Sequence, residues 1–132
     1  MRIRLPALLF VAILAACQAP TSQPTVGAAK VEVSGVAQAG PVCPVERQPP
    51  DPACADRPVA GAILVVTENG DEVTRTTSAA DGTFHLRLAP GEYQLVPQPA
   101  QGLMGTAQPI ALTVRTGEAV EPLVVAYDTG IR

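Results

Sequence analysis

Aromatic side chains are scarce in this sequence. Its 132 residues include two Phe, two Tyr and no Trp. Sugar-binding surfaces and grooves for single-stranded nucleic acid use exposed rings that stack on their ligands. Phe84, Tyr93 and Tyr127 can hardly serve both a hydrophobic core and such a surface. The composition therefore disfavours stacking sites and leaves most of the core to Val, Leu, Ile and Ala.

Basic side chains are also few. Nine Lys and Arg stand against twelve Asp and Glu, which gives a formal net charge of −3. If residues 1–16 are removed from the mature protein, Arg2 and Arg4 go with them, and seven basic residues against twelve acidic ones leave a charge of −5. Nucleic-acid binding needs clustered cations that displace the counterions of phosphates. We therefore expect no nucleic-acid partner.

The N-terminal segment has the layout of an export signal. Arg2 and Arg4 precede an apolar run over residues 5–14, which is shorter than the roughly 20 residues that span a bilayer as a helix. Leu14-Ala15-Ala16-Cys17 follows and resembles the lipobox of bacterial lipoproteins. The resemblance implies cleavage after Ala16 and attachment of lipid to the Cys17 thiol. Two or more acyl chains hold a protein stably on a bilayer.

These features predict a lipoprotein of the cell envelope, anchored to a membrane on its extracytoplasmic side. We expect residues 1–16 to be the signal peptide and residues 30–132 to form one folded domain. The segment 17–29 then consists of the lipidated cysteine and a flexible tether rich in Pro, Ser and Thr.

Two cysteines remain if Cys17 carries lipid. Cys43 and Cys54 would then pair as a disulfide in an oxidising compartment. The enclosed segment holds four prolines and no strand pattern, and its closure contributes roughly 3 kcal/mol by the chain-entropy estimate. No further His or Cys completes a zinc site, and Asp51 and Asp56 supply too few oxygens for calcium. We expect no metal and no cofactor.

Apolar and polar residues alternate along much of the domain, with no helical run. Phe84, Leu86 and Leu88 point to one face of a strand while Thr83, His85 and Arg87 point to the other. Residues 63–66 are continuously apolar, as in a strand buried on both faces, and Gly35 suggests a bulge or a close approach. Further strands are expected at 31–33, 110–114 and 123–127.

Turn signals separate these strands. Asn69-Gly70 and Asp81-Gly82 favour hairpins with type I′ turns, because both central residues of that turn need positive φ. Pro90-Gly91 and Gly117 mark further turns. The pattern predicts an all-β domain, a seven-stranded antiparallel Greek-key β-sandwich of the prealbumin-like or immunoglobulin-like kind.

Several of these residues also resemble a known family. Val59-Ala60-Gly61-Ala62-Ile63, Thr76–Phe84 (TTSAADGTF) and Leu88–Tyr93 (LAPGEY) are similar to the carboxypeptidase regulatory-like domain. The resemblance covers residues 30 to about 127 and implies a prealbumin-like sandwich. Ala79-Ala80 departs from the family pattern, which often has an acid before the Asp-Gly turn, and the 43–54 insertion is extra to it.

Catalytic groups are hard to find. The single histidine, His85, lies on the polar side of its strand, and no nucleophile motif accompanies it. Glu68, Asp71 and Glu72 are typical of solvated turn charges. Lys30 begins the first strand and Asp128 ends the last, so an isopeptide cross-link between them is conceivable, but the buried Glu that would assist it is missing. We expect no enzyme.

Three functional hypotheses follow from the sequence. The leading one is a membrane-anchored, non-enzymatic accessory or protein-interaction module that contacts another envelope or extracellular protein. A closed, stiff loop loses little entropy on binding, so the candidate contact residues are Val45, Glu46, Arg47 and Gln48. The same loop is equally well explained as a structural insertion. The alternatives are a small-molecule binding protein that uses the prealbumin-like sandwich, by fold analogy, and an enzyme.

Overall fold

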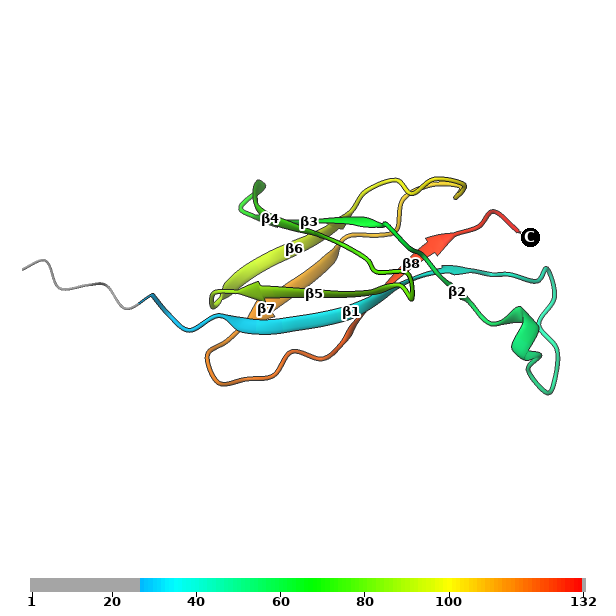
Figure 1. The fold of residues 1–132 in the computed structure, drawn as a ribbon, viewed down its shortest axis with the longest axis horizontal. Helices are drawn as coiled ribbons and strands as arrows, with labels where there is room; N and C mark the ends of the chain where they lie inside the picture. Colours follow the sequence, from blue (N-terminus) through cyan, green and yellow to red (C-terminus); the bar gives the residue numbers. More distant parts are fainter. Residues whose placement is uncertain (1–26, 132) are drawn as a thin grey trace, which may run out of the picture.

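The computed structural model describes residues 27–131, which fold as a sandwich of two β-sheets (Figure 1). The strands are β1 (Val31–Gly40), β2 (Arg57–Pro58), β3 (Ile63–Glu68), β4 (Asp71–Thr77), β5 (Thr83–Leu88), β6 (Gly91–Pro97), β7 (Ile110–Val114) and β8 (Leu123–Asp128), with one 3-10 turn, η1 (Pro52–Cys54). The predicted β-sandwich is confirmed. The strand count differs from the predicted seven because the two-residue β2 forms where the 43–54 segment returns to β1.

The predicted signal peptide, 1–16, and the predicted lipidation site, Cys17, lie outside the described residues. Only residues 27–29 of the predicted tether fall within them, and these three are exposed and outside any strand.

The two sheets differ in how their strands pair. One sheet has the order β4-β3-β6-β7 and is antiparallel throughout. In the other, β5 and β2 lie on one side of β1 and β8 lies on its other side. β8 runs parallel to β1, with Gly35 opposite Leu123 and Gly40 opposite Asp128. This pair departs from the predicted antiparallel arrangement, and it brings the first and last strands of the domain together.

The core lies between the sheets and follows the predicted alternation. The fully buried large side chains are Val33, Leu64, Val66, Phe84, Leu95, Val114, Val125 and Tyr127. The expectation that 63–66 is buried on both faces is wrong for Ile63, which is 41% exposed at the start of β3, whereas Leu64, Val65 and Val66 are buried.

Gly35 permits the close approach that the sequence suggested. A Cβ atom at this position would lie 2.4 Å from Cζ of Phe84 and 2.4 Å from the carbonyl oxygen of Leu123. The Phe84 ring therefore packs over the bare backbone of β1, on the strand directly opposite. A side chain at position 35 would force the ring and β8 apart.

The two Asx-Gly turns have different outcomes. Asn69 and Gly70 have φ values of 52° and 89° and form the predicted hairpin between β3 and β4. Asp81-Gly82 does not form a hairpin, because β4 and β5 belong to different sheets. Only Gly82 has positive φ there, at 81°. The Asp81 carboxylate accepts hydrogen bonds from the backbone N–H and the hydroxyl of Thr83, at 3.0 and 2.6 Å.

The ends of the sandwich carry different segments. Figure 1 places the start of β1 at one end and, at the other, the 41–56 segment, the 98–109 segment and the C-terminal residues. Ten residues of β1 separate these ends, which corresponds to about 33 Å of extended strand. The 41–56 segment therefore lies at the end of the domain opposite the start of β1.

Candidate functional site

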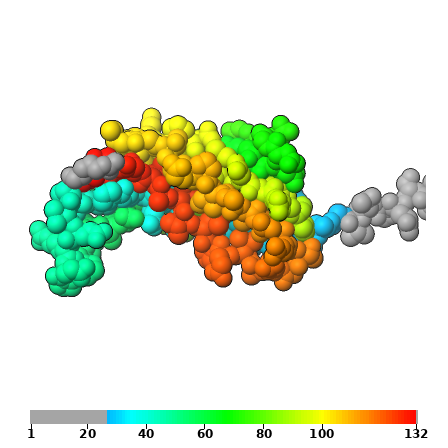
Figure 2. All heavy atoms as spheres, turned by 180° about the vertical axis from the view of Figure 1, so that it is seen from behind, coloured from blue at the N-terminus to red at the C-terminus, as the bar shows by residue number. Residues whose placement is uncertain are grey.

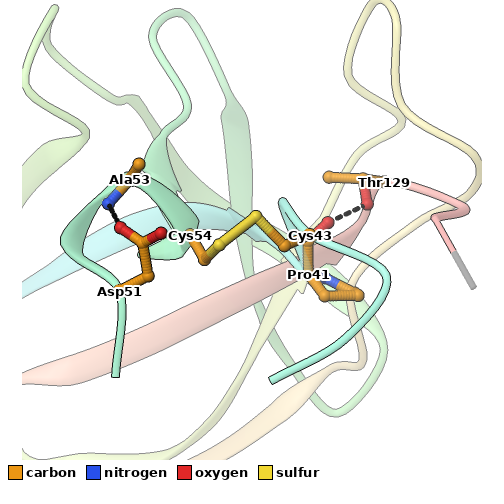
Figure 3. The surroundings of a disulfide bond; sticks show 6 residues. All are labelled: Pro41, Cys43, Asp51, Ala53, Cys54 and Thr129. Carbon is orange, nitrogen blue, oxygen red and sulfur yellow. Dashed lines mark hydrogen bonds between the residues drawn. A yellow bond between two sulfur atoms is a disulfide. The ribbon is translucent and has the colours of Figure 1, made fainter. Parts of the chain in front are cut away.

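A disulfide closes the loop that the sequence singled out. Cys43 and Cys54 are bonded, with sulfur atoms 2.11 Å apart and Cα atoms 5.2 Å apart (Figure 3). The predicted pairing is thus present. We refer to residues 43–54 as the disulfide loop.

The base of the disulfide loop is tied to the sandwich from several sides. β2 returns the chain to β1, and the Gln38 amide donates to the Asp56 carboxylate at 2.9 Å. The Thr129 hydroxyl, which follows β8, donates to the carbonyl of Pro41 (Figure 3). A Cβ at Gly40 would lie 2.0 Å from Oδ1 of Asp56. A glycine at position 40 is therefore what lets the Asp56 side chain lie against β1.

Within the loop, Asp51 organises the chain. Its carboxylate accepts from the backbone N–H of Ala53 at 2.9 Å and so caps η1 (Figure 3). Asp51 and Asp56 therefore bind different protein donors instead of converging on one point. Within residues 27–131, no three His, Cys, Asp or Glu side chains gather as metal ligands.

The far side of the loop is open to solvent. Val45 is 68% exposed, a large fraction for an aliphatic side chain, and Glu46, Arg47 and Gln48 are exposed as well. The last three line a hollow of about 370 Å³ together with Pro50, Asp51, Pro52, Cys54 and Ala55. Figure 2 shows the 41–56 segment projecting beyond the body of the domain. All four predicted contact residues are therefore exposed, and three of them line one hollow.

A second hollow lies at the base of the disulfide loop, and sequence reasoning missed it. Its volume is about 350 Å³, and its lining is mostly apolar: Ala39, Val42, Arg57, Pro58, Val59, Ala60, Gln101, Leu103, Thr129 and Ile131. These residues come from separate parts of the chain and meet only when β1, β2, the 98–109 segment and the C-terminal residues pack together. No spacing in the sequence signals this arrangement.

The titratable groups considered for catalysis are dispersed. The His85 side chain is 66% exposed on the outer face of β5, with Nδ1 3.5 Å from Oε1 of Glu32. Glu72 binds Arg75 through two hydrogen bonds of 2.7 and 2.8 Å, and these lower the pKa of the Glu72 carboxyl. Glu68 and Asp71 flank the β3–β4 turn. The prediction of solvated charges at this turn is confirmed for Asp71 and Glu72, which are exposed.

Lys30 and Asp128 are not neighbours, contrary to the expectation from their places in the sequence. Because β8 runs parallel to β1, Asp128 lies opposite Gly40, at the end of β1 remote from Lys30. The paired positions of β1 and β8 that point into the core are apolar, such as Ala37 beside Val125 and Ala39 beside Tyr127. An isopeptide bond between Lys30 and Asp128 is therefore ruled out by this arrangement.

Two comparisons with known proteins returned nothing: no protein family and no curated protein matches the chain. Solved structures do. A streptococcal ancillary pilin matches 80% of this chain with a TM-score of 0.53 and 20% identity, and the Bacillus anthracis TIE protein matches 74% with a TM-score of 0.52 and 18% identity. The likeness is one of fold. The chain spans only 31% and 17% of the lengths of those two proteins.

The described residues also bear on membrane crossing. None of the helical turns within residues 27–131 has the length and apolar character needed to cross a bilayer.

Proposed function

We propose that this chain is a lipid-anchored, non-enzymatic protein of the cell envelope whose β-sandwich is an accessory module that binds another envelope or extracellular protein through the disulfide loop. The observation that carries the proposal is the position of this loop. It is closed by a disulfide, it is exposed, and it lies at the end of the domain opposite the start of β1. Attachment of lipid at Cys17 would therefore leave the loop uncovered.

The lipobox-like residues support the lipid anchor. The dispersal of the titratable groups supports a non-enzymatic role. We further propose that the domain is of the carboxypeptidase regulatory-like kind. The residues that carry this resemblance have structural roles here, since Phe84 and Tyr93 are buried and Gly82 turns the chain between the sheets. Such roles support a fold and bring no catalytic group with them.

The disulfide supports binding in physical terms. A closed loop loses less conformational entropy on binding than an open one of the same length. The bridge, the η1 cap by Asp51 and the bond between Gln38 and Asp56 all restrict the loop before any partner arrives. The exposed Val45 offers apolar area, and Glu46 and Arg47 offer one charge of each sign without an ion pair within the described residues.

A photo-reactive amino acid at Val45 tests this proposal in cells that produce the full chain. We expect a discrete cross-linked product with one protein. The matched control is Val73, which is 48% exposed on β4, away from the loop. The Cys43→Ser/Cys54→Ser variant should lose the product, although it keeps the sandwich, because no core residue lies in 43–54.

A second variant separates the contribution of the loop side chains from that of the disulfide. Glu46→Lys combined with Arg47→Glu keeps the disulfide and the net charge and should also abolish the product at Val45. Equal cross-linking at Val45 and Val73, or a product that survives in both loop variants, would contradict the proposal.

The hollow at the base of the loop favours a second candidate function, the binding of a small apolar molecule. Val59 and Leu103 supply apolar walls, and Arg57 and Gln101 supply polar groups, the combination that is common in ligand sites. A thermal-unfolding screen of small apolar ligands tests it. A saturable rise in Tm that disappears in Leu103→Asn supports this function, and a rise that persists in this variant places the ligand elsewhere.

A further inference from the structure

The exposed edges of the two sheets are protected unequally. An edge strand offers unpaired N–H and C=O groups to any extended chain, and charged residues and bulges normally prevent such pairing. The β4 edge has both safeguards: Asp71, Glu72 and Arg75 carry charge, and the register with β3 shifts between Val66 and Thr67. On the same side of the sandwich, the Thr76 hydroxyl of β4 donates to the carbonyl of His85 in β5.

The β8 edge has neither safeguard. Residues 123–127 (LVVAY) contain no charge and no proline, and their register with β1 is unbroken. Within the described residues, the backbone of 123–127 pairs with β1 alone. Val124 is 53% exposed, and Ala126 is exposed beside it on the outer face. Figure 2 shows the orange-red chain of β8 at the surface.

The sequence of β8 complements itself. Directly opposed residues of an antiparallel pair must point to the same face, so two copies of β8 can pair only in registers that match odd positions with odd and even with even. The register centred on Val125 places Val124 opposite Ala126 and Leu123 opposite Tyr127, and every opposed pair is uncharged. The registers shifted by one residue along each strand bring either Pro122 or Asp128 into the pairing.

We propose that β8 is a self-association edge, at which β8 of a second copy of this chain adds in antiparallel register centred on Val125. The two β1-containing sheets then form one continuous sheet across a twofold axis. The disulfide loops stay outside the paired region, because each begins beyond Gly40 at the end of its own β1. This association is independent of the partner proposed for the loop.

The dimer is expected to be weak. A pairing of five residues covers less area than the about 800 Å² per partner that is usual in stable complexes. It should therefore form measurably only at high protein concentration, such as the high local concentration of a protein confined to a membrane surface.

Sedimentation velocity on the chain from Gln18 onward tests the proposal, since this chain retains every core residue. From about 10 µM to about 1 mM, a range suited to weak complexes, the mean mass should rise from one chain toward two. V124K/A126K places like charges directly opposite each other and should stay monomeric. V124K/A126E places each introduced lysine opposite an introduced glutamate and should restore the dimer. A111K/T113K on the exposed face of β7 is the matched control and should leave the dimer intact.

Two results would overturn the proposal: wild type that remains monomeric over the whole range, or V124K/A126K that associates as wild type does. Should a charged variant fail to fold, hydrogen exchange of the wild type decides. The amides of 123–127 should exchange more slowly at high than at low protein concentration, and equal exchange rates at both would refute the pairing.

Discussion

At the residue scale, Ser78 holds together two segments that the sequence did not connect. Among the described residues it is the only polar residue that is buried, at 5% exposure. Its hydroxyl oxygen accepts from the backbone N–H of Ala62 at 2.9 Å and donates to the carbonyl of Val59. The stretch TTSAADGT reads as a polar turn in the sequence, so nothing local indicates that one of its hydroxyls is buried.

Ser78→Ala should destabilise the domain. The substitution leaves the buried N–H of Ala62 and the partly buried carbonyl of Val59 without this partner, which costs about 1–3 kcal/mol of unfolding free energy. Urea denaturation of both proteins measures the loss. Ser34→Ala is the matched control, because Ser34 lies on the outer face of β1 and its hydroxyl makes no hydrogen bond within the described residues. Equal stability of the two alanine variants would show that the Ser78 bonds contribute nothing.

At the scale of elements, the sequence predicted strands well and their partners less well. Alternation located β5, β7 and β8 within a residue of their bounds, because one buried face imposes a period of two. The parallel pairing of β1 with β8 had no local signal, since paired residues such as Gly35 and Leu123 are 88 positions apart. The predicted Asp81-Gly82 hairpin was also wrong. An Asx-Gly pair indicates a change of chain direction, but it does not indicate which sheet the next strand joins.

The Asp81 turn gives an element-scale prediction about pH. Hydrogen bonds from the hydroxyl and then the backbone N–H of Thr83 lower the pKa of the Asp81 carboxyl below its usual value of 3.8. A lowered folded-state pKa adds stability above the unfolded-state pKa, and this stability is lost as pH falls through the folded-state value. The advantage of wild type over Asp81→Asn should therefore be largest at neutral pH and shrink below about pH 4.

Urea denaturation at about pH 7 and about pH 2.5 measures this difference. Asp71→Asn is the control, because it removes the same charge from the exposed β3–β4 turn, where the structure gives its carboxylate no hydrogen bond. A gap between wild type and Asp81→Asn that stays constant or widens in acid would contradict the assignment of these bonds to the ionised carboxylate.

Some features of the candidate site could be predicted from the sequence, and others could not. The disulfide and the exposed 45–48 segment could be predicted, because cysteine pairing and a proline-rich insertion are legible in the sequence. The hollow at the base of the loop and the tie from Thr129 to Pro41 could not, because they depend on where β8 ends in space. The residues that form the disulfide loop can thus be identified from local sequence, whereas the position of the loop depends on how the whole domain folds.

At the scale of the whole molecule, the two proposed binding surfaces lie in different places on the sandwich. The disulfide loop occupies the end remote from Lys30, and the unprotected β8 edge runs along one side. The two proposals therefore concern separate surfaces, and each can be tested without disturbing the other.

The anchor itself is the most direct test of the proposed function. The full chain, extracted with detergent from the membranes of producing cells, can be measured by intact mass spectrometry followed by fragmentation of its N-terminus. We expect a protein that begins at Cys17, carries a diacylglyceryl group on that sulfur and an acyl group on its amino nitrogen, and is two hydrogen masses lighter for the Cys43–Cys54 bridge. A protein that retains Met1 and bears no fatty acid, or one with an unmodified Cys17 thiol, would contradict this expectation.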